Sequence, residues 1–226
     1  MKYLNRNKIY HKIEPFKNAK KLYLFCEGDK EVNYFRYFQG FASNIDIIPI
    51  PNDNGKSDPV KLKENSELLF FGSEAVNSKL TLSEELQDEI WFVIDTDRWN
   101  EGDKINILKA YLAERNKDYK GWFVVQSNPC FELWLFYHFH SERPRSDEVS
   151  GYSSFKEYVN SKIIGGFDNR SMPLEIQKAA LASKENFEIL NGQPTLYSTE
   201  VFYLAKQIIR FTKSQLDYCL ENLKIR

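Results

Sequence analysis

The sequence is poor in the residues that build zinc sites and disulfide frameworks. Its three cysteines, Cys26, Cys130 and Cys219, lie far apart and form no CxxC pair, which argues against both kinds of site. We expect them to be partly buried thiols in a reducing cytoplasm. The chain has three histidines. Two of these, His138 and His140, are two residues apart in a predicted helix, where they do not face a common site.

Long apolar runs are also absent. No apolar stretch reaches the roughly 18 residues of a membrane-spanning helix, and the N-terminal residues form no apolar signal-peptide core. The sequence therefore predicts a cytoplasmic protein with no membrane partner. It contains no internal repeat and no low-complexity linker, so residues 21–226 are interpreted as a single domain.

Net charge is close to zero, but positive charge gathers at the N-terminus. The value of −1 excludes a bulk polycation. Residues 1–20 are interpreted as a basic arm in which Glu14 is the one acid. Such an arm suits contact with a phosphate backbone, with Lys20 and Lys21 as candidate nucleic-acid contacts. A solvated terminus would have the same composition, so charge alone leaves both interpretations open.

Aromatic residues are abundant, with 17 Phe, 13 Tyr and 4 Trp, and a disordered chain would not carry them. Four apolar runs, at 22–26, 45–50, 90–94 and 122–126, are typical of strands buried on both faces of a parallel sheet. Helical patterns separate them. Together they predict an α/β fold whose central, mostly parallel sheet is flanked by helices. After residue 130 the pattern is helical, which predicts a helical C-terminal portion.

Acidic residues follow three of the predicted strands. Glu27 ends the first, and Glu31 comes four residues later, at the start of a predicted helix. Asp95 and Asp97 follow the third strand, and Glu132 lies shortly after the fourth. Ligands of open α/β sheets bind outside the carboxyl ends of the strands. The sequence therefore predicts a cluster of carboxylates along one edge of the sheet.

A divalent metal would supply the counter-charge that such a cluster needs. Asp95 and Asp97 flank one residue and so point to the same side of an extended segment. Oxygen ligands without histidine or cysteine favour Mg²⁺ or Mn²⁺, as one or two ions. Two such ions can activate a water and stabilise the leaving oxygen of a phosphodiester. Glu27, Glu31, Asp95, Asp97 and Glu132 are therefore the candidate ligands.

Each acid also has a structural interpretation. Glu31 and Glu132 could be helix N-terminal acids that interact with the helix dipole, and Asp97 could form an ion pair with Arg98. Gly28 would let the backbone turn sharply and approach a ligand closely. The segment "FELWLFYHF" at 131–139 is apolar nearly all round, which favours a helix buried against the sheet over a partner groove.

Four segments resemble the RloB-like family in the order in which that family carries them. They are "CEGDKEVNYF", "FVIDTDRW", "SNPCFELWLFYHF" and "GQPTLYSTEVFYLAKQI", and they extend from about residue 20 to 210. The resemblance implies a Toprim-like fold in which Glu27, Asp95 and Asp97 hold magnesium. Similarity to Toprim nucleases of the overcoming-lysogenization-defect type implies that Glu31 and Glu132 are further ligands.

The resemblance also implies a function and a partner. RloB-like proteins are commonly encoded beside an ABC/AAA-type ATPase in bacterial anti-phage or abortive-infection systems, so an ATPase partner and a nucleic-acid substrate are expected. One departure concerns the metal count, because Arg98 and Trp99 follow the DxD motif where a further Asp or a Gly-containing turn is frequent. Arg98 joins the candidate nucleic-acid contacts.

Toprim nucleases can use a lysine to stabilise the transition state. Lys30, Lys56 and Lys162 are candidates, and Lys56 ranks first because it lies in the loop after the second strand. The leading hypothesis is thus a metal-dependent nuclease with Glu27, Asp95, Asp97 and Lys56 as catalytic residues. Two alternatives remain: a phosphohydrolase of a small nucleotide, and a sensing or docking subunit without turnover.

Overall fold

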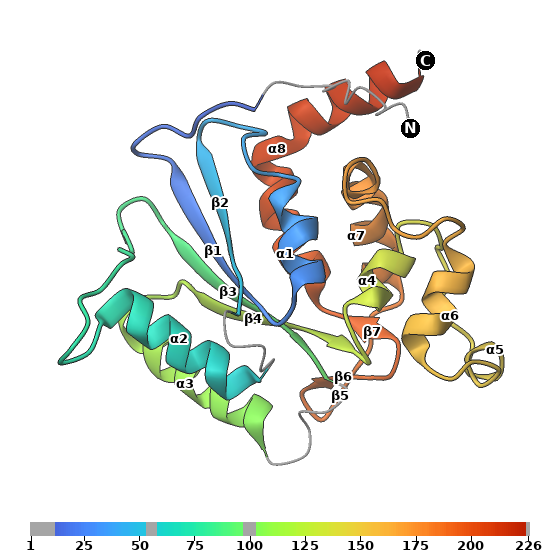
Figure 1. The fold of residues 1–226 in the computed structure, drawn as a ribbon, viewed down its shortest axis with the longest axis horizontal. Helices are drawn as coiled ribbons and strands as arrows, with labels where there is room; N and C mark the ends of the chain where they lie inside the picture. The colour runs from blue at the N-terminus through green and yellow to red at the C-terminus, as the bar shows by residue number, and fades with distance from the viewer. Residues whose placement is uncertain (1–11, 53–57, 97–102, 225–226) are drawn as a thin grey trace.

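A five-stranded sheet of order β2-β1-β3-β4-β7 forms the centre of the structure (Figure 1). The computed structural model describes residues 12–52, 58–96 and 103–224. The strands are β1 Lys20–Cys26, β2 Ile45–Ile50, β3 Glu89–Asp95, β4 Trp122–Asn128 and β7 Ser198–Thr199. Strands β1 to β4 are parallel, and the short β7 pairs antiparallel with β4. The carboxyl ends of β1, β3 and β4 are therefore neighbours at one edge.

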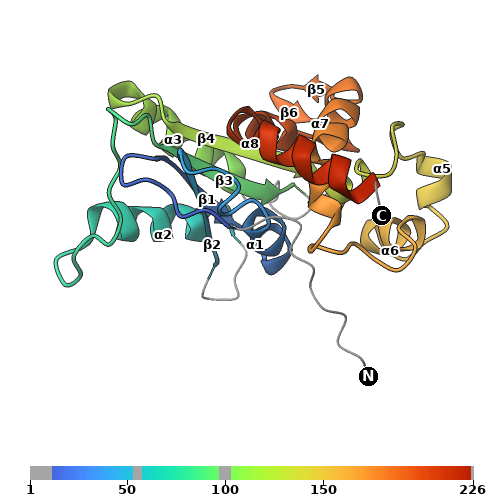
Figure 2. The same cartoon turned by 90° about the horizontal axis from the view of Figure 1, so that it is seen from above.

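Helices cover both faces of the sheet. They are α1 Asp29–Arg36, α2 Pro59–Phe71, α3 Lys104–Asp118, α4 Glu132–Phe136, α5 Ser146–Val149, α6 Phe155–Lys162, α7 Ile176–Glu185 and α8 Val201–Lys224, with a 3₁₀ helix at Met172–Glu175. Helices α2 and α3 lie on one face, and α1, α4, α7 and α8 lie on the other. Figure 2 shows that α5 and α6 lie on the side away from α2 and α3. The predicted mostly parallel α/β sheet flanked by helices is confirmed.

Alternation along β1 divides the core in two. Leu22, Leu24 and Cys26 pack into the cluster beneath α1, α4, α7 and α8, whereas Tyr23 and Phe25 pack against α2 and α3. All five side chains are buried. A strand that is apolar on both faces has no solvent side, which explains the continuous apolar run in the sequence. Among the described helices, none has the length and apolar character needed to cross a membrane.

Two helices end before the apolar pattern of their segments does. The apolar pattern at 31–41 continues to Phe41, but α1 ends at Arg36 and a turn follows. Gly40 has a φ of +76° there, and a Cβ would lie 2.9 Å from the Lys12 side chain. The pattern at 173–190 continues apolar after α7 ends at Glu185, because the chain turns into the small hairpin of β5 Ile189–Leu190 and β6 Gln193–Pro194.

Candidate functional site

Glu27 joins the ends of β1 and β3. Its backbone N–H donates to the Val93 carbonyl at 3.2 Å, which continues the parallel ladder one residue beyond β1. Its side chain is buried, and Oε2 accepts the backbone N–H of Asp95 at 2.9 Å. One oxygen of the carboxylate is thus fixed by the backbone, while the side chain as a whole lies at the carboxyl edge of the sheet.

Gly28 and Glu31 begin α1. The N–H of Gly28 donates to Oε2 of Glu31 at 3.1 Å, an interaction that caps the helix. A Cβ at position 28 would lie 3.1 Å from that same oxygen, so a larger residue would displace the carboxylate. The glycine therefore lets a buried glutamate fold back over the end of β1. Glu31 thus caps the start of α1 and also lies at the carboxyl edge of the sheet, as its two interpretations from the sequence predict.

Asp95 is the last residue of β3 and is buried. Its Oδ1 accepts the backbone N–H of Phe131 at 2.7 Å. The next residue, Thr96, donates its N–H to the carbonyls of Ser127 and Pro129, at 2.9 and 3.2 Å. These bonds tie the end of β3 to the segment after β4, where Asn128 and Pro129 are joined by a cis peptide bond.

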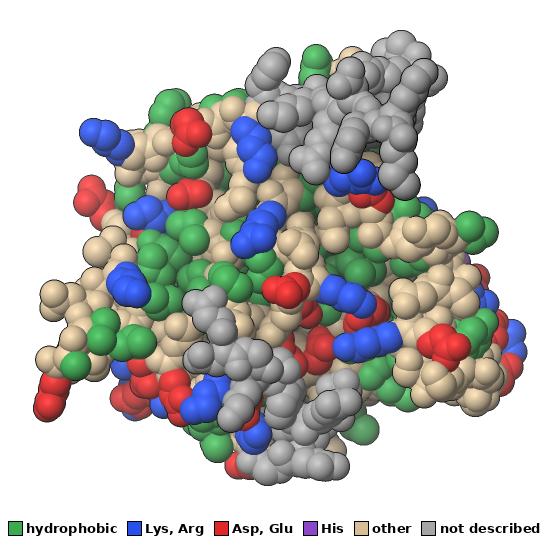
Figure 3. Space-filling model, in the orientation of Figure 1, with side chains coloured by type: hydrophobic (Ala, Val, Ile, Leu, Met, Phe, Trp, Pro, Cys, Tyr) green, Lys and Arg blue, Asp and Glu red, His purple; other side chains and the backbone are tan. Residues whose placement is uncertain are grey.

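Glu132 begins α4 and is 2% exposed. Lys30, from α1, lies 2.5 Å from its Oε1, and Lys156, from α6, lies 3.9 Å from the same atom. Both lysine side chains are about half exposed. The carboxylate is therefore buried beneath two cations that reach it from different helices. Figure 3 shows acidic and basic side chains side by side on this face, between α1 and the α4–α6 region.

The acids influence one another's protonation. Burial, together with the neighbouring charges of Glu27, Glu31 and Glu132, raises the pKa of Asp95 well above its ordinary value. Burial and the charge of Glu132 likewise raise the pKa of Glu31, to about 7, against the effects of its backbone hydrogen bonds and of Lys156. Burial also acts to raise the pKa of Glu132, but the hydrogen bond from Lys30 and other contacts outweigh it and lower the pKa. Among the described residues, the positive charge near Asp95 and Glu31 thus does not offset burial and the neighbouring acids.

Cys130 belongs to this cluster. Ligand atoms of Asp95, Cys130 and Glu132 all lie within 4.8 Å of one another, a spacing that one metal ion can span. Burial and the adjacent charges of Glu132 and Asp95 raise the pKa of the Cys130 thiol, which keeps it protonated without a metal. Buried carboxylates suit a hard divalent ion, so Asp95 and Glu132 fit the Mg²⁺ or Mn²⁺ that the sequence predicts, whereas a protonated thiol is not a ligand that these ions favour.

Three predicted residues fall outside the described part of the chain: Lys56, Asp97 and Arg98. Their assigned roles stay predictions. Asp95, the described member of the DxD pair, lies beside Glu27 as expected. The structure thus brings together Glu27, Glu31, Asp95 and Glu132, which are four of the five carboxylates proposed as ligands.

Other candidate residues lie away from this edge. Lys20 is buried at the amino end of β1 in an ion pair with Glu89, and Lys21 is half-buried beside it. Their contact with nucleic acid stays a prediction. Lys162 pairs with Glu148 at the far end of α6.

His138 belongs to the core. Its Nε2 lies 3.0 Å from the Tyr34 hydroxyl, and its Nδ1 lies 3.0 Å from the Trp134 carbonyl. Burial lowers its pKa to about 3. The segment from 131 to 138 is buried as predicted, although α4 itself is short.

Sequence reasoning missed Cys130 and Lys156. The position of Cys130 two residues before Glu132 was the available signal, since both follow the same strand end. No local signal marks Lys156, because only the packing of α6 against α4 brings it to Glu132. Lys30, in the motif "EGDKE", lies at the cluster, and Lys56 lies outside the described residues.

The stability of the metal-free protein is expected to fall as pH rises through the range in which Glu31 loses its proton. The ordinary pKa of 4.5 applies to the unfolded chain, and about 7 applies to the folded one. Between these values the folded protein binds a proton that the unfolded chain has released, so the free energy of unfolding decreases with pH, by about 3 kcal/mol from this group. Urea unfolding in a chelator from pH 4.5 to 7.5 measures this.

The variant Glu31→Gln provides the control for that measurement, because its amide does not titrate. The difference in unfolding free energy between wild type and variant should therefore change across the same pH range in favour of the variant. A difference that stays constant with pH would show that Glu31 titrates normally.

Comparison with models of protein families gives a match to the RloB-like protein family over residues 22–208. No curated protein and no solved structure is matched. The matched range covers most of the chain and includes all the acids described above. The protein therefore belongs to the RloB-like family.

Proposed function

We propose that the protein is a Mg²⁺- or Mn²⁺-dependent nuclease that hydrolyses phosphodiester bonds of DNA or RNA. The observation that carries this proposal is the convergence of four buried acids from three neighbouring strand ends, two of them with pKa values raised by burial and by the neighbouring acids. A structural acid cluster would be expected to have its counter-charges built in. Among the described residues, the charge of Lys156 lowers the pKa values of Glu31 and Asp95 but does not offset burial and the neighbouring acids.

Asp95 and Glu132 would hold one ion, with the Cys130 thiol beside it, and Glu27 and Glu31 would complete the set of ligands from the other side of the cluster. A divalent ion at this position supplies a nucleophilic water at neutral pH and stabilises charge on the leaving oxygen. Lys30 and Lys156 reach over Glu132 from α1 and α6. Their ammonium groups would then meet the phosphate oxygens of the substrate, which is the role that sequence reasoning gave to Lys56.

The backbone hydrogen bonds of the site serve orientation. Glu27 and Asp95 each have one carboxylate oxygen held by a peptide N–H, at 2.9 and 2.7 Å. These bonds hold both side chains in place at the carboxyl edge of the sheet, and fixed ligands of this kind would reduce the entropy lost on metal binding.

Family membership supports two further parts of the proposal. RloB-like proteins are expected beside an ABC/AAA-type ATPase in anti-phage systems, so we propose an ATPase partner and a defence role. The two alternatives, a phosphohydrolase of a small nucleotide and a docking subunit, predict different results in binding and cleavage experiments. A small nucleotide would use the same metal, and a docking subunit would bind neither metal nor substrate.

The proposal is tested by calorimetry with Mn²⁺ and Mg²⁺ and by cleavage of plasmid DNA and tRNA. We expect wild type to bind the metal and to cut one of the substrates, and Glu132→Gln to lose at least about tenfold in metal affinity because a buried ligand is removed. The matched control is Glu64→Gln, an exposed glutamate paired with Lys61 on α2. Absence of metal binding in wild type would favour the docking subunit.

A further inference from the structure

A second polar cavity lies beyond the acid cluster, where α4 ends and α5 and α6 pack. Its volume is about 320 Å³, near the lower end of the roughly 300–1,000 Å³ of small-molecule sites. Three cations line it, Arg143, Arg145 and Lys162, against two acids, Glu142 and Glu148. The described lining is thus rich in donors of the kind that bind anions.

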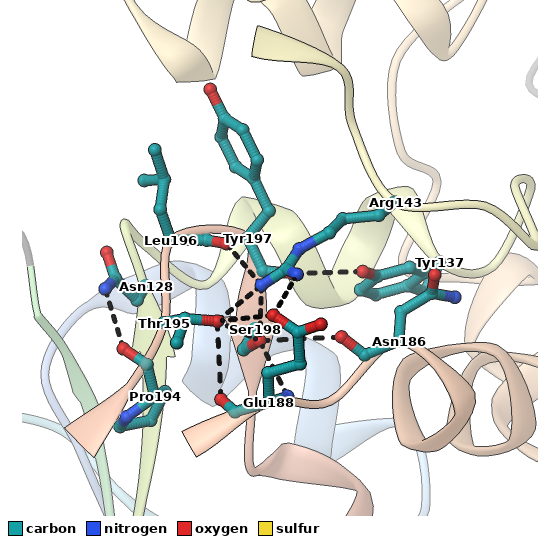
Figure 4. A network of polar contacts seen from close by, with 10 residues as sticks. All are labelled: Asn128, Tyr137, Arg143, Asn186, Glu188, Pro194, Thr195, Leu196, Tyr197 and Ser198. Carbon is teal, nitrogen blue, oxygen red and sulfur yellow. Dashed lines mark hydrogen bonds and ion pairs between the residues drawn. The ribbon is translucent and has the colours of Figure 1, made fainter. Parts of the chain in front are cut away.

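Arg143 is fixed at the wall of this cavity. Its guanidinium donates to Thr195 Oγ1, to the Leu196 carbonyl and to Ser198 Oγ at 2.5, 2.6 and 2.9 Å, and it pairs with Glu188 at 2.6 Å (Figure 4). Within the described residues, its Nε is buried and has no hydrogen-bond partner. Arg143 is therefore a rigid cation whose terminal nitrogens are already engaged and whose charge is fixed at the cavity wall.

Arg145 and Lys162 are held less firmly. Arg145 pairs with Asp147 at 2.6 Å, and both side chains are more than 60% exposed. Lys162 pairs with Glu148 at 2.8 Å, with both side chains more than a third exposed. Exposed ion pairs of this kind contribute little to stability. An anion with two charges can therefore recruit both cations at small cost.

Helix α6 connects this cavity with the acid cluster. Lys156, in its first turn, lies 3.9 Å from Glu132, and Lys162 ends the helix at the cavity wall. Six residues of α-helix span about 9 Å. A strand with one phosphate at the acid cluster could thus present another phosphate to the cavity, and a free nucleotide there would touch the helix that carries Lys156.

We propose that this cavity is a second site, which binds a phosphate group through Arg145 and Lys162, beside the fixed charge of Arg143. The fork of an arginine matches the oxygens of phosphate, and an adjacent lysine adds a point charge. The phosphate could belong to the substrate strand, in which case the site rests on the proposed nuclease function, or to a free nucleotide, in which case it does not. The chemistry of recognition is the same in both cases.

The test compares the double variant Arg145→Gln, Lys162→Gln with a matched double variant, Arg170→Gln, Lys213→Gln. The control removes an arginine that pairs two residues away, with Asp168, and a lysine that pairs with Asp217 on α8. All measurements are made with a chelator, so that no strand is cut. Calorimetry with inorganic phosphate and AMP tests a free ligand. Fluorescence anisotropy with short single-stranded DNA and RNA over a range of salt concentrations tests a strand.

We expect the cavity variant to lose at least about tenfold in affinity for one probe, and the control to match wild type. Loss for AMP or phosphate alone identifies a free nucleotide. Loss for the oligonucleotide, with a shallower dependence of affinity on salt by about one to two phosphate contacts, identifies the strand. Equal affinities of the cavity and control variants for every probe would overturn the proposal. Cleavage does not enter this result, so the nuclease proposal can fail separately.

Discussion

Replacing Asp95 with asparagine should reduce metal-supported cleavage by roughly a thousandfold, equivalent to about 4 kcal/mol of transition-state stabilisation. The amide keeps an oxygen that can accept the Phe131 N–H, but it removes the negative charge that a divalent ion requires. Because Asp95 lies nearest the centre of the cluster, among Glu27, Glu31 and Glu132, the other acids cannot substitute for it. Single-turnover cleavage with Mn²⁺ measures the change.

The variant should remain folded, so its loss of cleavage can be distinguished from a loss caused by unfolding. Without metal, burial and the neighbouring acids make the charged form of Asp95 unfavourable in the folded protein. The asparagine variant has no such charge and should unfold at a temperature equal to or above that of wild type. Asp217→Asn, which changes an exposed aspartate of α8, is the control and should cleave normally. Full cleavage by the Asp95 variant would exclude the proposed centre.

Truncation of Trp134 is expected to have the largest effect on stability. The side chain is fully buried in α4, beneath the site, and its ring packs edge-on against Tyr34 and His138 at centroid distances of 6.2 and 5.4 Å. Trp134→Ala should lower the free energy of unfolding by about 3–5 kcal/mol, the typical cost of removing a large buried aromatic group. Equilibrium urea unfolding provides the measurement.

Phe139→Ala is the matched control, because it removes an aromatic ring from the same segment. This side chain is 38% exposed, so its truncation should cost less than about 1.5 kcal/mol. Equal costs at the two positions would contradict the difference in burial between Trp134 and Phe139.

The central sheet could be predicted because its strands are apolar on both faces and are separated by helices. Each of the four predicted runs is a strand; the run at 45–50 coincides with β2, and the other three strands are longer than their runs by two residues. The strands β5, β6 and β7 have two residues each, too few for a periodic pattern. The apolar residues after Glu185 continue the helical pattern without forming a helix, because Phe187 packs against α8 residue Phe202 after the chain has turned.

The acids of the site could be predicted because parallel strands bring their carboxyl ends to one edge, whatever the loops between them do. That argument locates Glu27, Asp95 and Glu132 from strand order alone. It cannot locate Lys156, which comes from a helix that packs on the edge from outside the strand–helix repeat. It also cannot show that Lys30 reaches Glu132, since side-chain reach depends on how α1 is tilted.

The antiparallel pairing of β7 with β4 has a consequence for the order in which the protein is made. Ser127 and Thr199 share a hydrogen bond of 2.8 Å, and Tyr197 donates its N–H to Asn128 at 2.7 Å. Translation delivers chains at about 5–20 residues per second, so β4 waits several seconds for the strand that completes its edge. During that interval the chain already contains every acid of the cluster, but β4 has no partner strand on its outer side. Maturation of this edge is therefore one of the last events of synthesis.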